Sequence, residues 1–285
     1  MLGAIEAGGT KFVCAVGDET GKIVERIQIP TTVPSETIPQ VIAFFKKYSI
    51  EAIGIGSFGP IDVNLDSATY GNITSTPKPG WKDYPFVQAI KEALAVPVGF
   101  NTDVNAAALG EATFGAAKGL DSCLYITVGT GIGAGAVVQG KLLQGLSHPE
   151  MGHILVRRHP EDQYAGKCPY HQDCLEGLAA GPAIEERWGA KGVELVSREE
   201  VWEMEAYYIA QALMQYILIL SPKKIILGGG VMNQKQVFTS IYKYFPEFLN
   251  DYVTLPELSD YIVSPGLGDN AGIIGSLLLA KEALH

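Results

Sequence analysis

Positive charge is scarce in this chain of 285 residues, which has 21 lysine and arginine residues against 31 aspartate and glutamate residues. The formal net charge is −10 at pH 7 and the isoelectric point is near 5.0. Proteins that bind nucleic acid gather lysine and arginine to neutralise phosphates. The charge balance therefore argues against a nucleic-acid partner.

Long apolar runs are also missing. The longest one, residues 212–220, is interrupted by Gln215 and ends at Ser221-Pro222, well short of the roughly 20 apolar residues of a membrane span. The first residues, MLGAIEAGG, lack the basic and apolar regions of a targeting signal. We therefore expect no membrane association and a cytoplasmic location.

Cysteine is rare, with four residues in all, and two of them fall in the short stretch CPYHQDC. Cys168, His171 and Cys174 are spaced three apart there, as a disulfide, a redox pair or a metal site would allow. Stable disulfides are uncommon in a reducing cytoplasm, and a close Cys/His cluster more often binds metal. Cys14 and Cys123 lie on apolar strands, where cysteine behaves as a small buried hydrophobe.

Glycine is abundant, with 33 residues, and it marks the ends of predicted strands. Gly8-Gly9-Thr10 joins two predicted strands and Gly129-Thr130-Gly131 joins two more. A further strand follows each pair, so that the pattern of strand, glycine turn, strand and strand occurs twice. The six strands are expected at residues 2–7, 11–17, 22–30, 122–128, 132–138 and 141–144. This repetition indicates an internal duplication.

Helices and strands alternate elsewhere along the chain. Helices are expected at residues 36–48, 84–95, 103–117, 198–219, 233–249 and 269–283, and strands at 52–57, 97–101, 223–229 and 261–264. Such alternation is typical of the α/β class. We expect an N-terminal lobe of residues 1–118, a C-terminal lobe of residues 119–268, a cleft between them, and a last helix (269–285) that packs back on the first lobe.

The two glycine turns suit the binding of a polyphosphate. Glycine lets backbone N–H groups approach an anion closely, and Lys11 adds a charge suited to phosphate. One such turn could equally be a plain hairpin, but two in corresponding places favour a grip on both ends of a nucleotide's phosphates. The second turn joins strand to strand, so it is not the dinucleotide fingerprint, which must open a helix.

Seven stretches in order along the chain together resemble the ROK family (repressors, open reading frames, kinases), within the actin-like ATPase fold. They are most similar to the bacterial fructokinases of that family. The stretches are IEAGGTKFVCAVG, GPID, NTDVNAAALGE, VGTGIGAG, HPEMGH, CPYHQDCLEGLAAGPAI and LGGGVM. The resemblance implies ATP-dependent phosphorylation of a hexose, chiefly fructose to fructose 6-phosphate, by a homodimer.

Asp103 follows a predicted strand at the start of a helix, where an aspartate commonly caps the helix. A positioned aspartate can instead accept the proton of a sugar hydroxyl that attacks the γ-phosphoryl group. The resemblance places the catalytic base at Asp103. It also places sugar contacts at Asn101, Glu150, His153 and Glu176.

The resemblance places ATP contacts at both glycine turns, at the start of a helix near Pro182, and at the turn after a strand at residues 228–230. These residues are Gly8, Gly9, Thr10, Lys11, Thr130, Gly131, Gly133, Pro182, Gly228, Gly229 and Gly230. Mg²⁺ is expected with ATP, held mainly by phosphates and water. Glu6 stands where actin-like kinases usually have aspartate, and we do not assign it as a direct metal ligand.

Zinc in structural sites takes four nitrogen or sulfur ligands, and Cys168, His171 and Cys174 supply three. The resemblance implies a structural zinc that also uses a histidine from the HPEMGH stretch, which here is His153. Many family members have Cys-x-Cys-Gly in this loop, whereas this chain has a histidine one position later. His159 is a weaker candidate ligand.

Two other functions fit parts of the sequence. The substrate could be another hexose, such as mannose or glucose, whose hydroxyls resemble those of fructose. The protein could also be a sugar-sensing repressor that does no chemistry. Such repressors carry a DNA-binding domain before the sugar domain, whereas the first predicted strand here begins at residue 2, and Asp103 and both glycine turns favour catalysis. The polar loop 71–81 is expected to line the sugar cleft.

Overall fold

The structure, a computed structural model, describes all 285 residues. The chain forms two compact units, each of which draws on separate stretches of sequence. The first unit comprises residues 1–119, 135–149 and 266–285, and the second comprises residues 120–134 and 150–265. None of the helices is both long and apolar enough to cross a membrane.

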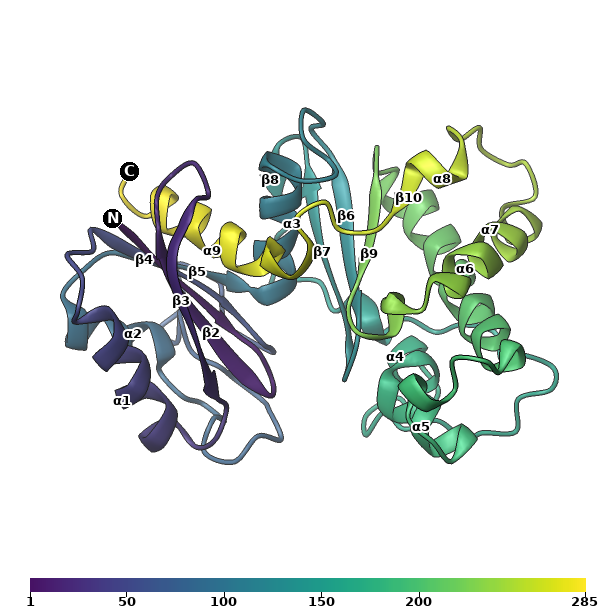
Figure 1. Ribbon diagram of the computed structural model, residues 1–285, viewed down its shortest axis with the longest axis horizontal. Helices are drawn as coiled ribbons and strands as arrows, with labels where there is room; N and C mark the ends of the chain where they lie inside the picture. The colour runs from purple at the N-terminus through teal and green to yellow at the C-terminus, as the bar shows by residue number, and fades with distance from the viewer. The chain divides into compact units, whose positions relative to one another are not determined.

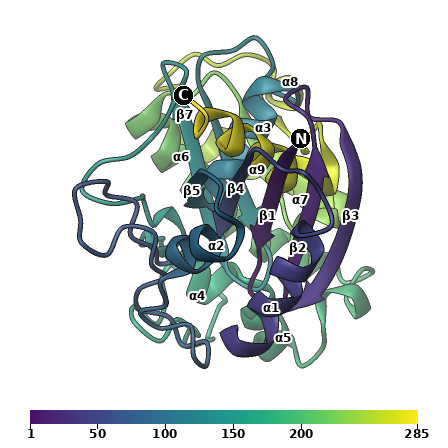
Figure 2. The same ribbon diagram turned by 90° about the vertical axis from the view of Figure 1, so that its left-hand side faces the viewer.

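The first sheet has five strands in the order β3-β2-β1-β4-β5 (Figure 2). Strand β1 pairs antiparallel with β2 and parallel with β4, so the first three strands form a meander and the last two are crossover additions. The strands are β1 (Leu2–Ala7), β2 (Lys11–Gly17), β3 (Ile23–Pro30), β4 (Ala52–Ser57) and β5 (Val98–Thr102).

Both faces of this sheet are covered. Helices α1 (Pro34–Phe45) and α2 (Phe86–Leu94) lie on one face, and α9 (Ala271–Glu282) lies on the other, with α3 (Asp103–Thr113) packed against α9 (Figure 1). Side chains alternate along a strand, so residues of β1 enter two separate apolar clusters, with Ile5 toward the α1 side and Ala4 toward α9.

Helix α9 lies directly against the backbone of the sheet. A Cβ atom added to Gly54 would come within 1.8 Å of the carbonyl oxygen of Ser276, and one added to Gly99 within 2.2 Å of the carbonyl oxygen of Leu279. Real Cβ atoms do not make such contacts, so this close approach of helix and sheet requires glycine at both positions.

The second sheet repeats the topology of the first. Its order is β10-β9-β6-β7-β8, which is again a three-strand meander extended by two strands on the side of its first member. The strands are β6 (Cys123–Val128), β7 (Ile132–Val138), β8 (Lys141–Leu142), β9 (Ile225–Gly228) and β10 (Ile262–Val263). The shared order confirms the predicted α/β class and the predicted duplication.

The second unit holds the remaining α-helices, which are α4 (Leu175–Ala179), α5 (Gly181–Trp188), α6 (Glu199–Leu220), α7 (Lys235–Leu249) and α8 (Leu258–Tyr261). Short 3₁₀ helices occupy Met151–His153, Gly192–Glu194 and Val231–Asn233 in this unit, and Gly268–Asn270 in the first unit. The bounds of the long helices agree with the predicted ranges to within a few residues at both ends. Helix α4 was not predicted, because five residues are too short to display helical periodicity.

Candidate active site

The predicted site residues fall into two groups, one in each unit, and each group is described by itself. In the first unit, Asp103 is the first residue of α3 and directly follows β5. Thr102 caps this helix, because its Oγ1 accepts a hydrogen bond from the Asn105 N–H at 3.1 Å. Asn101 is buried, and its Oδ1 accepts from the Thr102 N–H at 2.9 Å and from Asn105 Nδ2 at 2.8 Å.

The capping role that the sequence allowed for Asp103 therefore belongs to Thr102. A threonine before an acidic first turn is itself a capping signal, and the sequence offers it at Thr102. Asp103 is half-exposed, and its Oδ1 accepts from the Val104 N–H at 2.9 Å. Its carboxylate sits at the N-terminal end of α3.

The first glycine turn, which links β1 to β2, contains Gly8, Gly9, Thr10 and Lys11. Neighbouring loops occupy its carbonyl oxygens. Thr31 donates to Gly8 O through Oγ1 at 2.8 Å and to Thr10 O through its N–H at 2.9 Å, and Lys78 Nζ donates to Gly9 O at 2.6 Å. With its carbonyls engaged in this way, the turn has a fixed orientation.

Glu6 lies on β1 next to this turn and is half-buried against the N-terminus of α9. A Cβ atom added to Gly272 would lie 2.7 Å from the Glu6 carboxyl carbon. Burial raises the pKa of Glu6 to about 7, although the charges of Arg26 and Lys11 oppose the shift. A carboxyl group that changes charge near neutral pH thus stands beside the turn.

Ionisation of Glu6 should destabilise the ligand-free protein as the pH rises. The folded-state pKa of about 7 exceeds the ordinary value of 4.5. The contribution of Glu6 to the free energy of unfolding is therefore fully present below about pH 4.5 and is lost as the pH rises to about 7. The loss amounts to about 3 kcal/mol. We expect Glu6→Gln to flatten this part of the pH profile of the unfolding free energy, measured with urea. The exposed control Glu36→Gln should keep the wild-type profile, and equal slopes for Glu6→Gln and wild type would assign the titration to another group.

In the second unit, three stretches predicted separately to contact ATP come together. The Gly181 N–H at the start of α5 donates to Gly129 O in the second glycine turn at 2.7 Å. A Cβ atom added to Gly129 would lie 4.0 Å from the backbone nitrogen of Gly230, just after β9. The turn with Thr130, Gly131 and Gly133, the helix start with Pro182, and the segment Gly228–Gly230 therefore form one glycine-rich surface.

Glu176, on α4, lies between this surface and His153. Its Oε2 accepts a hydrogen bond from the Ile132 N–H at 2.9 Å, and a Cβ atom added to Gly131 would lie 2.7 Å from the same oxygen. Its Oε1 lies 4.0 Å from His153 Nε2. Glu176 thus links a predicted sugar residue to the second glycine turn, a contact that its position in the sequence does not reveal.

Glu150 and His153 flank one turn of 3₁₀ helix. The His153 N–H donates to Glu150 O at 3.1 Å. Side chains three apart eclipse each other in a 3₁₀ helix, so Glu150 and His153 lie on the same side of this turn. The Tyr216 hydroxyl donates to Met151 O and ties this turn to α6.

Four side chains gather into a metal-sized cluster, namely His153, Cys168, His171 and Cys174, whose ligand atoms all lie within 4.8 Å of one another. Cys168 Sγ lies 3.6 Å from His153 Nδ1 and 3.8 Å from His171 Nδ1, and Cys174 Sγ lies 3.5 Å from His153 Nδ1. Zn–S bonds of about 2.3 Å and Zn–N bonds of about 2.0 Å in a tetrahedron separate sulfur from nitrogen by roughly 3.6 Å. The donors therefore fit zinc.

The same region also bears on the other roles that the sequence left open for these residues. The thiols of Cys168 and Cys174 are free. His159 is not in the cluster, since its Nδ1 accepts from the Glu161 N–H at 3.3 Å and its ring packs on Tyr207. Burial, with a smaller effect of Cys168, raises the pKa of Cys174 to about 11, so only a bound cation would hold this thiol as the thiolate that metals bind.

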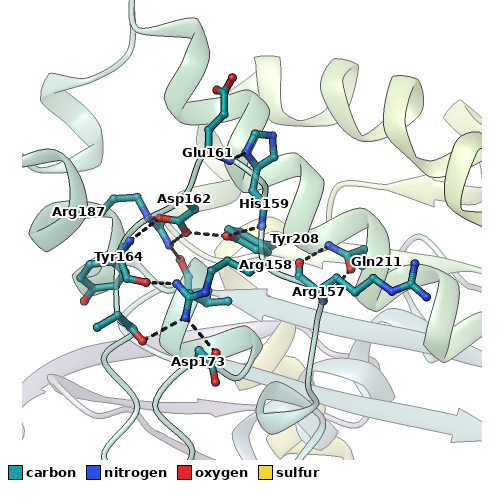
Figure 3. Close-up of polar contacts among 12 residues, drawn as sticks. Arg157, Arg158, His159, Glu161, Asp162, Tyr164, Asp173, Arg187, Tyr208 and Gln211 are labelled. Carbon is teal, nitrogen blue, oxygen red and sulfur yellow. Dashed lines mark hydrogen bonds and ion pairs between the residues drawn. The ribbon is translucent and has the colours of Figure 1, made fainter.

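The loop 156–174 is also fastened by polar contacts that involve no metal (Figure 3). Asp162 forms a buried ion pair with Arg187 at 2.9 Å and accepts from the Tyr208 hydroxyl at 2.6 Å. Burial alone would raise the pKa of Asp162, but hydrogen bonds from Tyr208 and the Tyr164 N–H, together with Arg187, hold it below its usual value. Arg187 also donates to Leu178 O at 2.8 Å, which connects the loop to the helix that carries Glu176.

A second set of contacts holds both ends of this loop. Gln211 on α6 accepts from the Arg157 N–H at 2.9 Å and donates to Arg157 O at 3.0 Å. Arg158 donates to Tyr164 O and pairs with Asp173 at 3.0 Å. The loop is thus anchored to α5 and α6 by protein contacts, and it carries the Cys/His cluster at its far end.

Similarity to known proteins extends over nearly the whole chain. The sequence model of the ROK family matches residues 2–283. A protein of Bacillus subtilis (strain 168) named "Putative fructokinase" is 68% identical, covering 100% of this chain and 97% of its own length. The fructokinase of Pediococcus pentosaceus is 50% identical, covering 100% of this chain and 99% of its own length. A crystal structure of a ROK family glucokinase from Streptomyces griseus, in complex with glucose and AMPPNP, aligns with a TM-score of 0.76 and 25% identity over 98% of each chain. The predicted actin-like ATPase fold is confirmed.

Proposed function

The chain belongs to the ROK family, and from this premise we propose that it is an ATP-dependent fructokinase that converts D-fructose to D-fructose 6-phosphate. One observation carries the choice of sugar, which is the identity of 68% and 50% over the full chain to two proteins named as fructokinases. The AMPPNP complex of a related glucokinase supports ATP as the phosphoryl donor.

In this proposal Asp103 is the general base. It accepts the proton of the sugar hydroxyl as that oxygen attacks the γ-phosphorus. Its position supports the role, because Thr102 caps α3 and the Asp103 carboxylate is half-exposed at the helix end. Asn101, Glu150, His153 and Glu176 are proposed to bind the sugar, whose hydroxyls need both donors and acceptors.

The nucleotide is proposed to use glycine turns of both units. Residues 8–11 would hold phosphate oxygens through backbone N–H groups and Lys11. The glycine-rich surface of the second unit, formed by residues 129–133, 181–182 and 228–230, would pass close to the rest of the nucleotide. Mg²⁺, when bound with ATP, would neutralise charge on the phosphates.

The cluster of His153, Cys168, His171 and Cys174 is proposed to hold a structural zinc, with no position left for water. A metal-binding histidine commonly turns its other nitrogen toward a carboxylate, and His153 does so, with Nδ1 in the cluster and Nε2 toward Glu176. The proposed role of the metal is to fix the ring of His153 beside the sugar.

We further propose that the protein acts as a homodimer in the cytoplasm. The family resemblance supports the homodimer. Sedimentation velocity at micromolar concentration would measure the oligomeric state directly.

The substrate is tested by ADP release with Mg-ATP against fructose, mannose, glucose, N-acetylglucosamine and N-acetylmannosamine. We expect kcat/KM for fructose to exceed that for each other sugar by about 10-fold or more, because a site built to pair specific hydroxyls discriminates strongly against sugars that leave its polar groups unpaired.

Asp103→Asn serves as the control for phosphoryl transfer in this assay, since it should release little ADP with any sugar. Preference for another hexose would keep the kinase and refute the fructose assignment. Sugar binding without turnover by the wild-type protein would support a sensor instead.

A further inference from the structure

Lys78 reaches the first glycine turn from a distant part of the chain. It belongs to the loop 71–81 and lies 69 positions after Gly9, yet its Nζ donates to Gly9 O at 2.6 Å. A Cβ atom added to Gly9 would meet the same Nζ at 3.0 Å. The ammonium group therefore sits against the turn that is proposed to bind phosphate.

The loop presents this lysine from a firm support. Pro77 and Pro79 flank Lys78, and each restricts the backbone. Three positions after Lys78, Trp81 is fully buried and donates from Nε1 to Thr32 O at 2.6 Å. The Lys78 ammonium also stands 5.3 Å from the centre of the Phe58 ring. The base of the loop is thus fixed, and the four-carbon stem of a lysine is flexible.

The charge of Lys78 has no acidic counterpart. Its ammonium donates to a neutral carbonyl, and burial is the only cause that lowers the pKa of Lys78, with no carboxylate acting on it. A half-buried ammonium group is stabilised more by a hydrogen bond to an anion than by one to a neutral carbonyl. The two other donors to the turn's carbonyls both belong to Thr31 and are neutral, so Lys78 is the one charged group held on these carbonyls.

We propose that Lys78 is a phosphoryl-binding residue of the kinase, which exchanges the Gly9 carbonyl for an oxygen of the γ-phosphoryl group when ATP binds. This inference rests on the proposed function. In the transfer, the bond between the γ-phosphorus and the oxygen bridging to the β-phosphate breaks, and the γ-phosphorus bonds to the sugar oxygen. The sugar proton passes to Asp103 and ADP leaves. Lys78 stays protonated throughout and stabilises charge on the transferring group.

Lys78→Met tests the proposal, because methionine keeps the length of the side chain and removes the charge. We expect kcat to fall roughly 10- to 100-fold, since removing one preorganised donor from a transferring group costs up to about 10²–10³. Affinity for AMPPNP should fall several-fold while affinity for ADP stays within about twofold, because only AMPPNP carries the γ-group. Titration calorimetry with Mg²⁺ present measures both affinities.

Two variants separate this role from a structural one. Lys78→Arg keeps the charge and should recover part of kcat, although its geometry differs. Lys82→Met removes an exposed lysine four positions away and should behave as wild type. If Lys78 only holds the Gly9 carbonyl, Lys78→Met will weaken AMPPNP and ADP equally, and this result would overturn the proposal, as would an unchanged kcat.

The test of Lys78 does not depend on which sugar is the substrate. If the wild-type protein prefers another hexose, kcat is measured with that hexose. If it phosphorylates no sugar, the proposed function fails, whereas the comparison of AMPPNP with ADP still decides whether Lys78 binds the γ-phosphoryl group.

Discussion

Asp103→Asn is expected to lower kcat by about 100-fold or more while sugar affinity changes by no more than about twofold. Asparagine has nearly the shape of aspartate and cannot accept the hydroxyl proton in the way a carboxylate does. The loss should appear in single-turnover rates as well as in kcat, because it lies in the chemical step.

The structure allows this variant to be made without unfolding the helix. Thr102 provides the cap of α3, and an acidic residue in the first helical turn adds only about 0.3–1 kcal/mol. Asp103→Asn should therefore change the unfolding free energy by less than about 1 kcal/mol, whereas Thr102→Ala should cost about 1 kcal/mol through loss of the cap.

Asp66→Asn is the matched control, since Asp66 is exposed on a loop of the same unit. It should retain wild-type turnover. Wild-type turnover in Asp103→Asn would remove Asp103 from the mechanism, and a parallel loss of stability and activity would point to a structural role.

Cys174→Ser is expected to abolish stoichiometric zinc binding. The wild-type protein should contain one zinc per chain by elemental analysis, and the variant should lose at least about 100-fold in zinc affinity, more than the 10–100-fold typical of residues outside the ligand shell. Loss of the metal should also weaken sugar binding, because His153 Nδ1 faces the cluster and its Nε2 faces Glu176.

Removal of zinc should loosen only one end of the loop 156–174. The ion pair of Asp162 with Arg187 and the hydrogen bond from Tyr208 fasten the loop to α5 and α6 without a metal. Hydrogen exchange after chelation should therefore rise around residues 168–175 and stay slow around residue 162.

Two controls test the ligand set. Cys14→Ala alters a buried cysteine of the first unit and should keep one zinc per chain. His159→Ala alters a histidine of the same loop that lies outside the cluster and should also keep it. A metal-free protein with full activity and full sugar affinity would contradict the proposed role of the metal, and zinc retained by Cys174→Ser would contradict the ligand set.

Local patterns made much of the fold predictable. The two glycine turns, the strands beside them and the long helices follow from glycine placement and hydrophobic periodicity, which act over a few residues. The duplication followed from the same patterns, and the shared order of strands in the two sheets confirms it.

Features that depend on tertiary contact were harder to predict. Spacing favoured His171 as a ligand and kept His159 as a weaker candidate, and the fold places His171, but not His159, beside the thiols. The start of α3 could be read with Asp103 as its cap, because a shift of one residue separates the cap from the first helical position. Lys78 gave no local signal of its contact with Gly9, because the two meet only through the folded loop.

The close packing of α9 on Gly54 and Gly99 has a consequence for the order in which the protein is made. Residues 266–285 complete the first unit, although every residue of the second unit precedes them in the chain. During translation the sheet that carries β1 and β4 must wait, with one face uncovered, until α9 leaves the ribosome. Because α3 packs against α9, the helix that begins at Asp103 gains this packing only after the whole second unit has been synthesised.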